Sequence, residues 1–222
     1  MGTVIFDLDG TLADTSADLI AAANACFWAL GLGRPLDPER DKATAFHGGR
    51  AMLRLGFDRT GGGDEAAVDR EYPHLLDHYA RRIDAETRMY PGAVEAVKGL
   101  RRDGYRTAVC TNKPEGLAED LLARLGVRDL FAALIGADTL PVRKPDPAPY
   151  VEACRRAGGE PARSLLVGDT LTDRKTAAAA GVPCILVTFG PEGEAVTDLD
   201  PEATIAGYGE LGETVRRLIG PA

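Results

Sequence analysis

The feature that most constrains the fold is a regular alternation of short apolar runs and amphipathic helical segments from Tyr90 onwards. Continuous apolar runs of this length are typical of parallel strands whose two faces are both covered by helices. The sequence predicts strands at 4–6, 107–110, 134–136, 164–167 and 184–187, and helices at 91–104, 117–125, 147–157, 172–180 and 211–219. We therefore expect an α/β fold with a doubly wound parallel core sheet.

A long helical segment interrupts this pattern after the first strand. Helical periodicity is present at 14–30, around 51–57 and at 64–83, and Pro73 within the last segment predicts a kink or a break. This arrangement predicts an inserted α-helical domain at 15–88 and a core domain formed by 1–14 and 89–222.

The composition excludes several classes of partner. The chain has 222 residues and a formal net charge of -8, without a run of basic residues that would suit a nucleic acid. No apolar stretch approaches a membrane span, and no signal sequence is recognised, so we expect a cytoplasmic protein without a membrane partner. Both a monomer and a homodimer are compatible with the sequence. The four cysteines are expected to be buried, reduced thiols: Cys26, Cys110, Cys154 and Cys184.

Two carboxylates stand at the end of the first strand. Asp7 and Asp9 are two residues apart, so on an extended chain both project to the same side. Such a pair is unfavourable unless a cation lies between the carboxylates or one of them carries a proton. Gly10 would let the backbone approach a ligand or adopt a positive φ, and Thr11 adds a hydroxyl that could cap a helix. The structural alternative is an ordinary acidic turn.

Polar residues also follow three of the later strands. Thr111 and Asn112 come after the second core strand and could bind phosphate or carboxylate oxygens. Lys144 follows the third strand and could offset the carboxylates, which an acidic protein with an anionic ligand would need. Asp169 follows the fourth strand and would complete an oxygen-rich shell of the kind that Mg²⁺ prefers. Asp173 could bind the metal, orient its ligands or stabilise a helix N-terminus.

In this order, these strand-end motifs resemble the four motifs of the haloacid dehalogenase superfamily. Several further segments resemble its phosphoglycolate phosphatase branch, which carries a helical cap after the first motif. The segments are Asp9 to Thr15, Tyr90-Pro91-Gly92, Thr111 to Pro114 and Val187 to Gly190. The resemblance covers essentially the whole chain and implies a Rossmann-like core and a phosphoric monoester hydrolase.

The resemblance also implies a role for each motif. Asp7 would be the nucleophile that forms an aspartyl-phosphate, and Asp9 would protonate the leaving alkoxide and later deprotonate water. Mg²⁺ would be held by Asp7, the backbone carbonyl of Asp9 and Asp169. Thr111 and Lys144, together with the Asn112 amide, would bind the transferring phosphoryl oxygens. The substrate would be a small phosphorylated metabolite.

The sequence of the predicted helical cap domain, 15–88, gives less information about substrate specificity. His47 and Arg50 are expected in a glycine-bearing loop, where Arg50 could bind a second anionic group such as the carboxylate of 2-phosphoglycolate or could simply face solvent. Arg174 departs from the family, in which this position is more often apolar. Alternative functions on the same fold are a sugar-phosphate mutase, a pyrophosphatase, a 2-haloacid dehalogenase and a non-catalytic binding module. Asp9 argues against the dehalogenase, because halide departure needs no proton donor.

Overall fold

The computed structural model describes residues 1–222 as two compact units. Met1–Ala13 and Met89–Ala222 form the first unit, and Asp14–Arg88 form the second. These bounds lie within one residue of the domain bounds expected from the sequence. That the second unit works as a cap stays a prediction.

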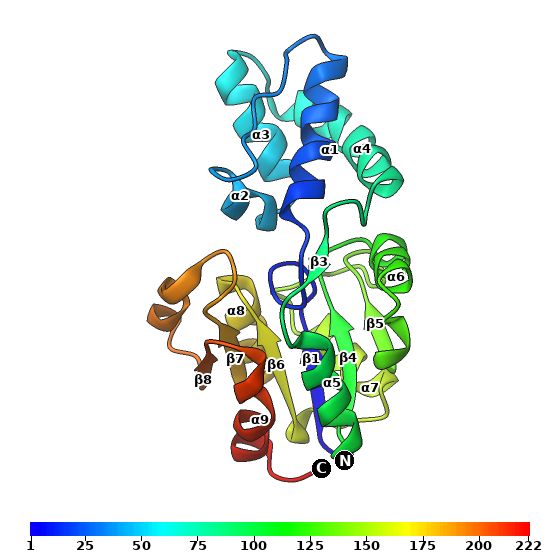
Figure 1. The fold of residues 1–222 in the computed structure, drawn as a ribbon, viewed down its shortest axis with the longest axis vertical. Helices are drawn as coiled ribbons and strands as arrows, with labels where there is room; N and C mark the ends of the chain where they lie inside the picture. The colour runs from blue at the N-terminus through cyan, green and yellow to red at the C-terminus, as the bar shows by residue number, and fades with distance from the viewer. The chain divides into compact units, whose positions relative to one another are not determined.

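The first unit is built on a six-stranded parallel sheet with the strand order β5-β4-β1-β6-β7-β8 (Figure 1). The predicted α/β class and doubly wound sheet are confirmed. The strands are β1 (Thr3–Phe6), β4 (Arg106–Cys110), β5 (Ala133–Ile135), β6 (Ser164–Gly168), β7 (Cys184–Val187) and β8 (Ala203–Ile205).

Strand β1 lies between β4 and β6, where the order of the sheet reverses. In the register, Phe6 pairs with Val109 of β4 and with Val167 of β6. The carboxyl ends of these strands therefore meet at one edge, which is where open α/β sheets bind their ligands.

Helices cover both faces of this sheet (Figure 1). On one face, α5 (Ala93–Arg102) packs on β4, α9 (Leu211–Ile219) packs on β6, and the two helices contact each other. On the other face, α7 (Ala148–Arg156) and α8 (Leu171–Ala180) pack on the central strands. Helix α6 (Glu115–Arg124) packs against β5. The apolar runs of the sequence thus become a sheet buried from both sides.

Four helices make up the second unit: α1 (Ser16–Ala29), α2 (Lys42–Phe46), α3 (Gly49–Thr60) and α4 (Glu65–Arg81). Helix α1 packs against the other three, and α3 packs against α4. An edge-to-face contact between Phe27 and Phe57, with ring centroids 5.1 Å apart, joins α1 and α3. Edge-to-face packing of this kind is favourable for two buried aromatic rings.

The structure differs from the sequence-based prediction in several elements. Helix α4 continues through Pro73, because buried residues such as Val68, Leu75 and Tyr79 on either side anchor both of its halves. Helix α2 and edge strand β8 have no counterpart in the prediction. Arg50 lies in the first turn of α3 and not in a loop.

Short elements connect the main ones. Strands β2 (Ala13–Asp14) and β3 (Arg88–Met89) form a separate two-stranded sheet. The 3₁₀ helices are η1 (Arg128–Leu130), η2 (Pro161–Arg163), η3 (Gly193–Leu199) and η4 (Tyr208–Glu210). All four cysteines are buried and free, as expected. No helix has the length and apolar character needed to span a bilayer.

Candidate active site

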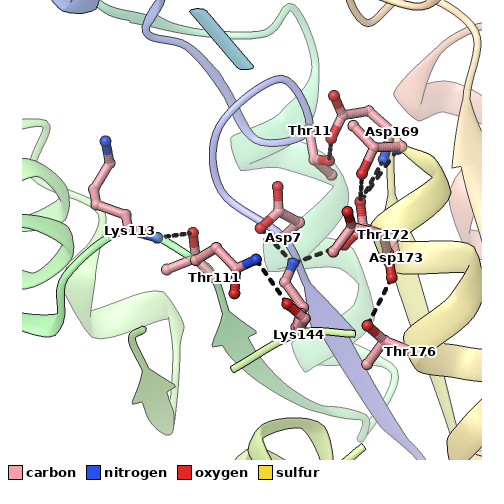
Figure 2. A network of polar contacts seen from close by, with 11 residues as sticks. Asp7, Thr11, Thr111, Lys113, Lys144, Asp169, Thr172, Asp173 and Thr176 are labelled. Atoms are coloured by element: carbon pink, nitrogen blue, oxygen red, sulfur yellow. Dashed lines mark hydrogen bonds and ion pairs between the residues drawn. The ribbon is translucent and has the colours of Figure 1, made fainter. Parts of the chain in front are cut away.

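Asp7 is the first residue beyond strand β1, and its position is set by the sheet. Its backbone N–H donates to the Val167 carbonyl of β6 at 2.9 Å, which continues the parallel ladder by one residue. The Asp7 side chain is buried, and its Oδ1 lies 2.7 Å from Nζ of Lys144. The same ammonium lies 2.7 Å from Oδ1 of Asp173 (Figure 2). One lysine therefore bridges two buried carboxylates.

Burial dominates the electrostatics of this pair. It raises the pKa of Asp7 to about 7, against the lowering effect of Lys144, and the nearby Asp173 and Asp9 add to the rise. Burial by itself would lower the pKa of Lys144, but Asp173 and Asp7 raise that pKa well above 10.5. Lys144 is thus a permanent cation at the end of β1.

Asp169 is the first residue beyond β6 and is fully buried. Its Oδ1 accepts a 2.8 Å hydrogen bond from the Thr11 hydroxyl, while its Oδ2 is buried without a hydrogen-bond partner. Burial raises the pKa of Asp169 well above 3.8, and Asp173 and Asp7 raise it further. Helix α1 begins only at Ser16, so Thr11 does not cap a helix as its sequence context suggested and binds Asp169 instead.

Gly10 is required for this approach. Its φ is 83°, and a Cβ atom at this position would collide with Oδ2 of Asp169. Only glycine combines that backbone conformation with that closeness. The sequence-based prediction was that Gly10 approaches a ligand or adopts a positive φ. The structure confirms the positive φ and places Gly10 against the carboxylate of Asp169, and its approach to a ligand stays a prediction.

The carboxylates of Asp7, Asp169 and Asp173 form a cluster whose oxygens lie within 4.8 Å of one another. Asp7 and Asp173 share one lysine, and the unpartnered Oδ2 of Asp169 has no hydrogen-bond donor from the chain. Hard oxygen ligands with an excess of negative charge fit a divalent cation such as Mg²⁺. The side chain of Asp9 is not part of this cluster, and the ligand role of its backbone carbonyl stays a prediction.

Asp173 is already satisfied by the chain. Its Oδ1 binds Lys144, and its Oδ2 accepts hydrogen bonds from the Thr170 hydroxyl at 2.8 Å and the Thr170 N–H at 3.2 Å. These contacts form a capping box at the start of α8. Asp173 thus caps a helix, which is one of the roles that the sequence left open, and it also holds Lys144. Its role at a metal stays a prediction.

Thr111 and Asn112 follow β4 as expected, with one contact that the sequence did not predict. Thr111 is buried, and its Oγ1 accepts a 3.1 Å hydrogen bond from the Lys113 N–H. The side-chain amide of Asn112 donates to the Lys144 carbonyl at 3.0 Å. Asn112 therefore ties the segment that carries Lys144 to the end of β4.

Two residues near the site were not recognised in the sequence. Lys113 forms an ion pair with Asp9, with 3.0 Å between Nζ and Oδ1. Its position two residues after Thr111 is a signal that could have identified it, because alternate residues of an extended chain share a side. The Tyr208 hydroxyl donates to the Thr11 carbonyl at 2.8 Å. No local signal indicates this second contact.

Two arginines singled out in the sequence have partners elsewhere. Arg50 pairs with Asp69 and lies over the ring of Tyr72, with 4.6 Å between the guanidinium carbon and the ring centroid. Its predicted contact with substrate stays a prediction. Arg174 donates through Nε to the Leu199 and Asp200 carbonyls at 3.3 and 3.1 Å. It thereby anchors the connection between β7 and β8.

Comparisons with known proteins agree with this architecture. Residues 1–181 match the family model of haloacid dehalogenase-like hydrolases. A phosphoglycolate phosphatase of Mesorhizobium japonicum is 40% identical over 99% of this chain and 97% of its own length. One of Agrobacterium fabrum is 39% identical over 93% of this chain and 89% of its own length.

A solved structure shares the fold. It is described as a predicted phosphoglycolate phosphatase from Haemophilus somnus 129pt, with a TM-score of 0.84 and 24% identity. The match covers 96% of this chain and 97% of that chain. The family model and the two relatives identify the family of this chain. The chain belongs to the haloacid dehalogenase-like hydrolase family and is a phosphatase of that family.

Proposed function

We propose that this phosphatase is Mg²⁺-dependent, acts through an aspartyl-phosphate on Asp7, and hydrolyses a small carboxylated phosphomonoester such as 2-phosphoglycolate. Two observations together support the proposal: Lys144 forms an ion pair with Asp7, and one buried oxygen of Asp169 has no hydrogen-bond partner. The names of the curated relatives support the choice of substrate.

Asp7 is the nucleophile in this proposal. One of its oxygens attacks phosphorus as the bond between phosphorus and the leaving oxygen breaks, and the electron pair of that bond goes to the leaving oxygen. Asp9 supplies the proton that this oxygen takes up. In the second half, Asp9 removes a proton from water as the water oxygen attacks phosphorus and releases Asp7.

The transferring group carries negative charge that the protein must balance. Lys144 is a buried permanent cation 2.7 Å from Asp7, so it lies where phosphoryl oxygens would approach. The Thr111 hydroxyl and the Asn112 amide at the end of β4 are the further donors in the proposal. Asn112 contributes a second time by holding the Lys144 backbone.

The metal would be held by Asp7, Asp169 and the Asp9 carbonyl, and Asp173 would orient Lys144 beside it. When bound there, Mg²⁺ would neutralise the clustered carboxylates and the charge on the phosphoryl oxygens. Thr11 donates a hydrogen bond to Oδ1 of Asp169, so Oδ2 is the oxygen that would bind the metal.

The helical unit 14–88 is assigned to substrate specificity, with Arg50 as the ligand of the substrate carboxylate. Arg50 already pairs with the exposed Asp69, so a substrate carboxylate would compete with that partner. Changing Arg50 to Ala should reduce activity on carboxylated substrates and spare a generic aryl phosphate. Equal activity of the variant on both kinds of substrate would remove Arg50 from the site.

The proposed function is tested by phosphate release from a panel of small phosphomonoesters and pyrophosphate, with Mg²⁺ or with EDTA. Wild type is compared with Asp7→Asn and with Asp198→Asn, which makes the same change at an exposed position. We expect metal-dependent release that Asp7→Asn abolishes and Asp198→Asn retains. Release that persists in EDTA or in folded Asp7→Asn would contradict the proposal.

A further inference from the structure

Lys113 is a buried ammonium that the proposed mechanism does not use. Its side chain is 4% exposed, and its Nζ lies 3.0 Å from Oδ1 of Asp9, whose side chain is 18% exposed. A lysine is rarely buried to this extent unless it is paired. Desolvating its charge is unfavourable, so the pair must be held by its surroundings.

The backbone that carries Lys113 is fixed on both sides. Its N–H donates to the Thr111 hydroxyl at 3.1 Å, and its carbonyl accepts from the Ala137 N–H at 2.9 Å. Two residues later, the Glu115 N–H donates to Oδ1 of Asp138 at 2.7 Å. The end of β4 and the loop after β5 therefore hold the base of this side chain in place.

The two lysines of the site serve different carboxylates. Lys144 lies between Asp7 and Asp173, whereas the side chain of Lys113 extends away from that cluster (Figure 2). Each of the two acids at the end of β1 thus has its own ammonium. Asp9 needs a fixed orientation, because it must exchange a proton with the leaving oxygen.

We propose that Lys113 is a positioning residue that holds Asp9 through Oδ1 and so makes Oδ2 the oxygen that exchanges the proton. An ammonium has three N–H donors and no acceptor, so the oxygen it contacts cannot donate a proton toward it. The proton exchange proposed for Asp9 therefore takes place through Oδ2. The inference rests on the proposed roles of Asp7 and Asp9.

The transfer of the Asp9 proton determines which substrates are affected when Asp9 is misplaced. When the ester bond breaks, the leaving oxygen takes the proton from Oδ2, and Asp9 becomes a carboxylate beside Lys113. A poor leaving group such as an alkoxide needs this proton, whereas a nitrophenolate leaves without it. Misplacing Asp9 must therefore slow alkyl phosphates more than aryl phosphates.

The test is the ratio of kcat/KM for ethyl phosphate to kcat/KM for 4-nitrophenyl phosphate. Both are measured on the same sample, so the amount of active enzyme cancels even where a variant folds poorly. Variants are Lys113→Met, Lys113→Arg, Asp9→Asn and, as a matched control, Lys98→Met, which makes the same change on the exposed side of α5.

We expect Asp9→Asn to lower this ratio by about 100-fold or more, as loss of a general acid does. Lys113→Met should lower it by at least about tenfold, Lys113→Arg should lower it less, and Lys98→Met should leave it unchanged. A lowered ratio separates positioning from a structural role, which would reduce both rates equally.

Several results would overturn the inference. If Lys113→Met reduces both rates equally while Asp9→Asn lowers the ratio, Lys113 is only structural and the proposed mechanism stands. If Lys113→Met spares ethyl phosphate but raises KM for 2-phosphoglycolate, Lys113 binds the substrate carboxylate instead. If Asp9→Asn itself leaves the ratio unchanged, the proposed role of Asp9 fails, and the positioning role fails with it.

Discussion

Asp169→Asn should stabilise the metal-free protein while removing its activity. Asp169 is fully buried, and its Oδ2 has no hydrogen-bond partner. An asparagine at this position keeps an oxygen that can accept the 2.8 Å hydrogen bond from Thr11. The substitution therefore removes a desolvated charge without removing the contact that orients the side chain.

The magnitude follows from the electrostatics of the site. Replacing a buried ion pair by hydrophobic residues of similar volume is neutral or stabilises proteins by roughly 1–4 kcal/mol. Burial of Asp169 and its repulsion by Asp173 and Asp7 make its ionised form unfavourable, so we take a gain of about 2 kcal/mol, within that range. For a chain of this length, that free energy of unfolding corresponds to a rise in Tm of about 4–8 °C.

The effect should depend on pH with a defined sign. The pKa of Asp169 in the folded state lies well above its ordinary value of 3.8. At pH values between 3.8 and the raised pKa, the folded state therefore binds more protons than the unfolded state. The carboxylate therefore lowers stability as the pH rises from 3.8 through the raised pKa. Below 3.8 the acid is protonated in both states, so the advantage of the variant disappears.

Differential scanning fluorimetry of wild type and Asp169→Asn checks these expectations, in EDTA and in excess Mg²⁺, at about pH 5 and about pH 8. Asp198→Asn is the exposed control. In EDTA the variant should melt above wild type, more so at the higher pH. In Mg²⁺ the order should reverse, because a cation at 100 times its Kd stabilises wild type by about 2.7 kcal/mol.

Two outcomes would refute this reasoning. If the variant melts below wild type in EDTA at the higher pH, the Asp169 carboxylate is not a source of instability. If Mg²⁺ raises the Tm of both proteins equally, the cation does not bind at Asp169. Phosphatase activity of the variant equal to that of wild type would also contradict the proposed metal site.

Two further substitutions test the surroundings of the site. Lys144→Met should lower the free energy of unfolding by about 3–5 kcal/mol, because it leaves Asp7 and Asp173 buried without their shared cation, and it should lower activity at least about 100-fold. A thermal melt and a rate assay check this, and unchanged stability would show that the ion pairs contribute nothing. Tyr208→Phe removes the hydrogen bond to the Thr11 carbonyl, so it should lower the free energy of unfolding by about 1 kcal/mol and weaken Mg²⁺ binding. If calorimetric titration of the variant gives the wild-type Mg²⁺ affinity, Tyr208 is not linked to the metal site.

Much of the site could be predicted because its residues lie at the ends of strands. An apolar run followed directly by a polar residue marks a strand end, and parallel strands bring those ends to one edge. Asp7, Thr111 and Asp169 follow β1, β4 and β6 in this way. The helix-capping role of Asp173 could also be predicted, because a helix cap is a contact within a few residues of the chain.

The elements that were not predicted have identifiable causes. Strand β8 is a short edge strand of three residues, Ala203–Ile205, without the apolar run that marks the buried strands. Pro73 predicted a kink or a break, and α4 has no break there, because packing that the sequence alone does not show buries residues in both of its halves. Helix α2 is only five residues long, too short for a periodic pattern to show.

The sequence by itself determined the α/β class, the inserted helical segment and the acids and lysine offered at the edge of the sheet. Only the tertiary structure decided how those groups pair. Lys113 with Asp9, Thr11 with Asp169 and Tyr208 with Thr11 join residues that are far apart in the chain. Such pairs depend on strand order and register, which are set by packing of the whole sheet, so no local pattern contains them.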